Sequence, residues 1–231
     1  KEIKEKAIEE LEATLNNGFK KKKIFKAHQY IHIYTICYNM CTQREPFNHS
    51  EQLYNRHGEV ISKYLSETVV PALKSQRNEF LLKELVRRWD NHKMMNRWMK
   101  LFFMYLDRYY VKQYCKPTLS EAGIKHFKVQ VYDIVKVDAV NAMLSVINAE
   151  REGEIIDRNL IACCIEIFES MGMGQLDSYK EDFEKQFLNG TREYYARKAQ
   201  LWIEEDSTPD YLIKAEDRLE SERARVGHYL N

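Results

Sequence analysis

The chain has 231 residues, of which 31% are charged, and its 36 Lys and Arg are balanced by 35 Asp and Glu. A chain with so little net charge has no overall field that would steer it to nucleic acid or to an anionic membrane. No apolar run reaches the roughly 18 to 20 residues of a membrane span, and no signal-peptide pattern opens the chain. Its five cysteines are an odd number and several lie in helical patterns, so we expect reduced thiols in the cytoplasm and nucleus.

The first half of the sequence predicts five helices that form one unit. With only 4 Pro and 8 Gly, the composition favours long helices with short connections. Apolar residues recur at helical spacing, and Pro71 is expected to kink or end the third helix. Asn78 is expected to cap the fourth helix, which leads through Asp90 into the fifth. The predicted ranges are 1–15, 25–42, 50–74, 78–90 and 91–111.

The second predicted helix has two apolar faces instead of one. The first face carries Phe25, Ile33, Ile36, Cys37 and Met40. The second face carries Ala27, Tyr30, Ile31, Tyr34 and Tyr38, with tyrosines four residues apart and therefore one turn apart. A tyrosine face suits either a core seam or a surface that a partner covers, because the ring is apolar and the hydroxyl is polar.

The fifth predicted helix, residues 91–111, also has more apolar surface than one core face needs. A step of 100° per residue places one broad arc towards the core, made of Trp98, Met99, Phe102, Phe103, Leu106 and Tyr110. The opposite flank is polar but also holds Leu101, Met104 and Tyr105. An apolar strip with a charged edge needs a cover, which is either another helix or a protein partner.

A second helical series follows the break at residues 116–118. Helices are predicted over 119–135, 137–151, 157–171, 176–205 and 210–230, and the alternating Glu and Arg of the last one predict a solvated face. No convincing strand pattern appears, so the predicted fold is all-α. Two consecutive helical units, 1–115 and 116–231, suggest a helical repeat.

The sequence shows no catalytic or metal-binding pattern, so we expect a non-catalytic protein without cofactor or metal. It has no Gly-rich phosphate loop after a strand, no nucleophile elbow and no metalloprotease helix. His28, His32, Cys37 and Cys41 share one helix but lie near different faces, and no second ligand cluster follows. The lysine run 20–23 is expected to be a solvated loop.

Several segments, in their order along the chain, resemble the cullin family. The helix 33–42 looks most like the cullin one class. The matching blocks are Tyr105–Val111, Glu150–Asp157, Tyr179–Leu188, Thr191–Tyr195, Asp210–Leu219, Arg223–Val226 and His228–Leu230.

This resemblance implies an elongated, α-solenoid-like stack of five-helix cullin repeats, with residues 1–115 as the first repeat and 116–231 as part of the second. It implies a scaffold of an SCF-type ubiquitin ligase, which binds a Skp-type adaptor that carries an F-box protein. The RING subunit and the ubiquitin-like modifier would be held by a region that this sequence lacks. By position, the implied adaptor contacts are Tyr30, Ile31, Tyr34, Tyr38, Tyr105 and Arg108, and the strip adds Leu101 and Met104. The alternatives are a cullin with a BTB-type adaptor, or an unrelated helical repeat that binds other partners such as RNA.

Overall fold

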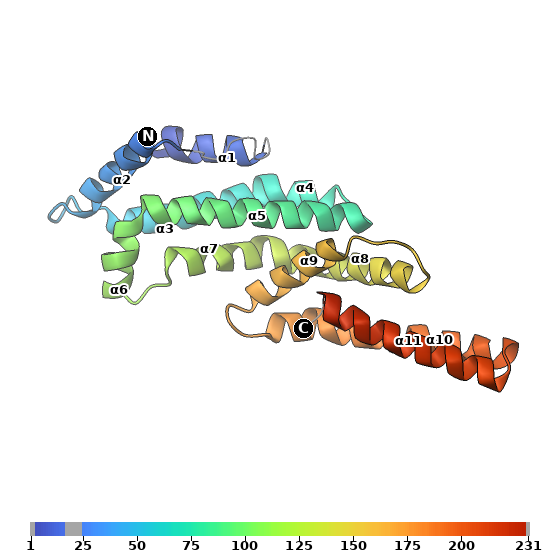
Figure 1. Ribbon diagram of the computed structural model, residues 1–231. Helices are drawn as coiled ribbons and strands as arrows, with labels where there is room; N and C mark the ends of the chain where they lie inside the picture. Colours follow the sequence, from blue (N-terminus) through green and yellow to red (C-terminus); the bar gives the residue numbers. More distant parts are fainter. Residues whose placement is uncertain (1–2, 17–24, 230–231) are drawn as a thin grey trace. The chain divides into compact units, whose positions relative to one another are not determined.

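The computed structural model describes residues 3–16 and 25–229, and these residues form helices and connections without a β-strand. The predicted all-α fold is therefore confirmed (Figure 1). The lysine run 20–23 lies outside the described residues. None of the described helices is long and apolar enough to cross a membrane.

The helices of the first half follow the predicted order but not all the predicted ends. They are η1 (Lys4–Ile8), α1 (Glu9–Asn16), α2 (Ala27–Cys41), α3 (Ser50–Tyr64), η2 (Leu65–Val69), α4 (Val70–Lys74), α5 (Asn78–Phe102), η3 (Leu106–Tyr110) and α6 (Val111–Gln113). The η elements are π-helical turns that run directly into the neighbouring α-helix. Pro71 does not end its helix, which continues to Lys74 after the π-helical turn η2.

The fifth predicted helix is corrected at both ends. It begins at Asn78 instead of residue 91, because nothing at Asp90 interrupts the helical hydrogen bonds. It breaks at Phe103, where the chain makes a turn before η3 and the amide of Leu106 donates to the carbonyl of Phe103 at 2.9 Å. A uniform step of 100° therefore does not hold across residues 91–111. Most of the predicted inward arc is nonetheless buried, although Trp98 is only half-buried.

The helices of the second half follow the predicted order, and two of the predicted helices are joined into one. They are α7 (Leu119–Phe127), η4 (Lys128–Tyr132), α8 (Asp133–Arg151), α9 (Arg158–Met171), η5 (Tyr179–Glu184), α10 (Lys185–Glu205) and α11 (Thr208–Tyr229). The two helices predicted over 119–135 and 137–151 are one continuous helical run, since no helix breaker separates them. The predicted cap of α9 is present, because the carboxylate of Asp157 accepts a hydrogen bond from the amide of Leu160 at 3.1 Å.

Contacts divide the chain into two compact units. The first comprises Lys1–Val69 and Arg88–Val131, and the second comprises Val70–Arg87 and Tyr132–Asn231. These units are defined by contacts and not by repeats, so the division into repeats at residues 115 and 116 stays a prediction.

In the first unit, α7 packs closely on α3 and α5 because glycines lie at the points of contact. A Cβ atom at Gly123 would lie 2.2 Å from Oδ1 of Asn96, and one at Gly58 would lie 2.9 Å from Nε2 of His126. The ring of His92 in α5 bonds the carbonyl of Gly123 at 2.9 Å. His126 in α7 bonds the hydroxyl of Ser62 at 2.8 Å. These polar contacts fix the register of α7 against its two neighbours.

Two buried histidines in this unit predict a loss of stability in acid. His57 and His92 are 3% and 1% exposed, and burial lowers the pKa of each from 6.5 to about 4. The folded protein therefore keeps both rings neutral at pH values where the unfolded chain binds protons. This stabilisation is complete above pH 6.5 and is lost as the pH falls towards 4. The loss is about 1.4 kcal/mol per pH unit for each histidine that titrates fully in the unfolded state.

The measurement is the urea midpoint in steps from about pH 7.5 to about pH 5. In His57→Gln, the slope of stability against pH should be smaller by the amount that corresponds to one bound proton. This holds even if the urea midpoint of the variant is lower at every pH. His28→Gln, at an exposed position of α2, is the control and should keep the steep dependence. An equally steep dependence in His57→Gln would show that other groups cause the acid effect.

In the second unit, α8, α10 and α11 meet around a buried guanidinium. Arg151 is 2% exposed, and its nitrogens donate to Glu222, Asn148 and Thr191 at 2.7 to 3.1 Å. Arg225 is also buried and pairs with Glu150 at 2.7 Å as well as with Glu222. The prediction that the charges of the last helix form a solvated face is therefore wrong at residues 222 and 225, because sequence spacing does not show a partner on another helix.

Candidate functional site

A row of partly exposed aromatic side chains in the first unit begins on α2. Because one turn of the helix separates them, the ring centroids of Tyr30 and Tyr34 lie 6.2 Å apart, and those of Tyr34 and Tyr38 also lie 6.2 Å apart. Tyr38 is 42% exposed, whereas Tyr30 and Tyr34 are half-buried. The three rings form a continuous row along one side of the helix.

The segment after the break at Phe103 extends this row. Tyr105 meets Tyr38 edge to face with centroids 5.3 Å apart, and Tyr109 follows Tyr105 at 4.6 Å. Burial raises the pKa of Tyr105, and the neighbouring tyrosine Tyr38 adds to this rise, so its hydroxyl stays neutral. We call the five side chains Tyr30, Tyr34, Tyr38, Tyr105 and Tyr109 the tyrosine band.

The band has a buried base and an open rim. At its base, the ring of Tyr30 lies 6.3 Å from that of Phe102, which is 1% exposed and packs on Phe25 at 5.2 Å. At its rim, Tyr109 is 57% exposed. The core packing at the base keeps the row of rings rigid, and the exposed rim leaves apolar ring surface and polar hydroxyls accessible. Such a combination is typical of protein-binding surfaces.

The structure brings together four of the eight residues predicted for the site, namely Tyr30, Tyr34, Tyr38 and Tyr105. Ile31 is 58% exposed and Arg108 is exposed, without a hydrogen bond or ion pair among the described residues. Leu101 and Met104 are half-buried and lie outside the stacked rings. The role of all eight residues stays a prediction.

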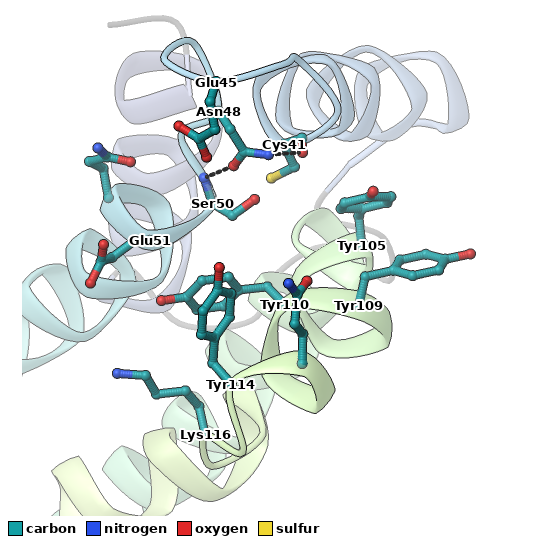
Figure 2. Close-up of a pocket in the computed structure, with 12 residues that line it drawn as sticks. Cys41, Glu45, Asn48, Ser50, Glu51, Tyr105, Tyr109, Tyr110, Tyr114 and Lys116 are labelled. Carbon is teal, nitrogen blue, oxygen red and sulfur yellow. Dashed lines mark hydrogen bonds between the residues drawn. The ribbon is translucent and has the colours of Figure 1, made fainter.

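Sequence reasoning missed Tyr109 and a hollow beside the band. Tyr109 follows Tyr105 by four residues in the block that resembles cullins, and this spacing was a usable signal. The hollow has a volume of about 370 Å³ and lies between the α2–α3 connection and the segment that contains η3 and α6 (Figure 2). Its lining comprises Cys41, Glu45, Asn48, Ser50, Glu51, Gln52, Tyr105, Tyr109, Tyr110, Gln113, Tyr114 and Lys116.

One asparagine holds the connection above the hollow. The side-chain nitrogen of Asn48 donates to the carbonyl of Cys41 at 2.8 Å, at the end of α2. Its side-chain oxygen accepts from the amide of Ser50 at 3.0 Å, at the start of α3. Asn48 thereby ties the two helix ends together, a role that such a side chain often has in turns. The edge of the hollow is fixed before any partner arrives.

The geometry gives no support to a metal site on α2. In the described ranges 3–16 and 25–229, no group of three or more His, Cys, Asp or Glu side chains is placed to hold a metal ion. Burial raises the pKa of the Cys37 thiol to about 12, and the nearby Cys41 adds to the rise. His28 and His32 are exposed, away from these buried thiols.

Comparison with known proteins identifies the family. The family described as the cullin alpha solenoid domain matches residues 8–231. The chain is 44% identical over 207 residues to putative cullin-like protein 1 of Arabidopsis thaliana. It is 44% identical over 230 residues to Cullin-1 of Oryza sativa subsp. japonica and 35% identical over 201 residues to Cullin-3 of Dictyostelium discoideum. The chain belongs to the cullin family, as the sequence blocks predict.

The matches cover nearly all of this chain but only part of the relatives. The aligned region is 90% of this chain and 29% of the Arabidopsis protein. For the rice protein these shares are 100% and 31%, and for the Dictyostelium protein they are 86% and 26%.

Proposed function

We propose that this chain is the adaptor-binding part of a scaffold in an SCF-type ubiquitin ligase. The observation that carries the proposal is the tyrosine band, in which α2 and the segment after Phe103 form one aromatic surface. The same two segments are the ones through which the cullin resemblance implies adaptor binding. The partner that covers the band is a Skp-type adaptor that carries an F-box protein.

The proposed contribution to ubiquitin transfer is positional. A stack of packed helices holds a substrate receptor at a fixed distance from the ubiquitin-charged enzyme, which raises their effective concentration without a catalytic group. The RING subunit and the ubiquitin-like modifier would bind a region outside residues 1–231. The complex would act in the cytoplasm and nucleus.

The choice of adaptor rests on the resemblance to one class of cullins. Identity is 44% to the rice Cullin-1 over 230 residues, against 35% to the Dictyostelium Cullin-3 over 201 residues. Identity to Cullin-2 of Arabidopsis thaliana is also 44%, over 207 residues, so the percentages separate the chain only from the Cullin-3 relative. The resemblance of the helix 33–42 to the cullin one class is what supports the Skp-type adaptor in this proposal. A BTB-type adaptor is the alternative, and it would cover the same band.

The band is tested by removing two of its rings. Truncating an aromatic anchor at the centre of an interface typically lowers the binding free energy by about 2 kcal/mol or more. The double variant Tyr34→Ala with Tyr105→Ala should therefore bind the adaptor well over tenfold more weakly. The measurement is calorimetric titration of a purified adaptor–F-box complex into each variant, with a BTB protein titrated in parallel. The helical circular-dichroism signal should survive, because neither ring is fully buried.

Phe80→Ala is the matched control, since Phe80 is a 70% exposed aromatic residue of α5 outside the band. It should bind the adaptor complex like the parent. Unchanged affinity in the double tyrosine variant would place the adaptor site elsewhere. Tight binding of the BTB protein alone would replace the Skp-type adaptor in this proposal.

A further inference from the structure

The hollow beside the tyrosine band has an unbalanced set of charges. Glu45 and Glu51 lie at its edge, and neither forms an ion pair with any described residue. Among the described residues that line it, Lys116 is the one basic residue. Two carboxylates against one ammonium leave the hollow with a net negative charge.

The floor of the hollow consists of aromatic rings. Tyr110 and Tyr114 pack with centroids 4.8 Å apart, and Figure 2 shows the Tyr114 side chain rising towards the connection that carries Glu45. Burial raises the pKa of the Tyr110 hydroxyl, and the charge of Glu51 adds to this rise, so the field of that carboxylate reaches the ring. A cation is attracted both by carboxylates and by the faces of neutral aromatic rings.

The hollow is also continuous with the band. Tyr105 and Tyr109 belong to the tyrosine band and line the hollow as well. A protein that covers the band therefore reaches the hollow without a second docking event. A volume of about 370 Å³ leaves room for the whole of a long side chain.

We propose that the hollow accepts an arginine or lysine side chain of the adaptor–F-box complex, held between the carboxylates of Glu45 and Glu51 and the exposed ring of Tyr114, with the buried ring of Tyr110 packed against Tyr114. This inference rests on the proposed function, because the same partner supplies the basic residue. Asn48 keeps the α2–α3 connection in place, so the backbone that carries Glu45 and Glu51 does not have to be ordered when the partner binds.

The charge is tested with Glu45→Gln and Glu51→Gln together. The adaptor–F-box complex should bind this variant about tenfold more weakly than the parent at about 50 mM salt, and the difference should shrink at about 500 mM salt. Asp138→Asn with Glu154→Gln removes the same charge from exposed positions of the second unit, and this control should bind like the parent. The replaced side chains are all exposed, so each variant should fold.

The aromatic contribution is tested at Tyr114, which is 57% exposed. Tyr114→Phe keeps the ring and should bind like the parent, whereas Tyr114→Leu should bind several-fold more weakly.

The outcomes separate the two proposals. If the double tyrosine variant loses binding while the Glu45 and Glu51 variant binds like its control, the hollow takes no basic side chain and the band remains the adaptor site. If the double tyrosine variant keeps full affinity, the proposed function fails and the proposal for the hollow fails with it.

Discussion

Replacing Phe102 by alanine is expected to lower the free energy of unfolding by about 3 to 5 kcal/mol, through lost burial and the cavity that remains. Phe102 is 1% exposed and packs on Phe25 and Trp98 at centroid distances of 5.2 and 5.8 Å. Tyr34→Ala should cost much less, because Tyr34 is only half-buried and its neighbours at 6.2 Å are themselves part of the open band.

The measurement for this pair is the urea midpoint of each variant, with unchanged slopes as evidence that the unfolding reaction is the same. Phe80→Ala serves as the control for loss of an exposed ring and should hardly move the midpoint. Equal losses of unfolding free energy for Phe102→Ala and Tyr34→Ala would contradict the assignment of Phe102 to the core and of Tyr34 to the partner-facing surface.

A loss of similar size is expected in the second unit for Arg151→Ala. The guanidinium of Arg151 forms two hydrogen bonds with Glu222, at 2.9 and 3.1 Å, and lies over the ring of Tyr194 at 5.2 Å. Burial alone would raise the pKa of Glu222, but hydrogen bonds from Arg151 and Tyr195 outweigh it and hold the pKa below its ordinary value. Removing one partner of a buried ion pair leaves the other charge with less compensation, which costs about 3 to 5 kcal/mol.

The matched control is Arg158→Ala, which removes an arginine that is half exposed and pairs with Glu150 at 2.7 Å. Arg158 is half solvated, and the buried Glu150 keeps Arg225 and Tyr229 as hydrogen-bond donors, so this midpoint should move less than that of Arg151→Ala. A second variant, Arg151→Met with Glu222→Leu, should recover part of the loss, because both charges are then replaced by apolar groups. Equal midpoints for Arg151→Ala and Arg158→Ala would show that the buried arginine is no more important for stability than the half-exposed one.

Local patterns in the sequence predicted much of the fold. Spacing and caps predicted most helices, and Asp157 caps α9 as expected. The break at Phe103 was not predictable, since its neighbours read as an uninterrupted amphipathic helix and neither Gly nor Pro marks the position. The π-helical turns have no sequence signal of this kind either, although the structure is helical over the whole predicted range 50–74.

Contacts between distant parts of the chain were the main limit for the site and for the second unit. The tyrosines of α2 were predicted to share a face, but their contact with Tyr105 joins residues far apart in sequence. Likewise, Glu150 and Arg225 lie in separate blocks that resemble cullins, and only the fold shows that they form one ion pair. Helical periodicity places side chains on a face but does not identify the opposite helix.

The carboxylate of Asp107 has a mechanical consequence for the first unit. Asp107 lies in η3, between Tyr105 and Tyr109, and its side chain accepts the amide of Leu119 at 2.8 Å, at the start of α7. Tyr54 of α3 adds a bond to the carbonyl of Pro117 at 2.8 Å, so the connection before α7 is held from two sides. A force that a partner exerts on the tyrosine band is therefore passed on to α7, because direct hydrogen bonds, and not a flexible linker alone, connect the band to the start of α7.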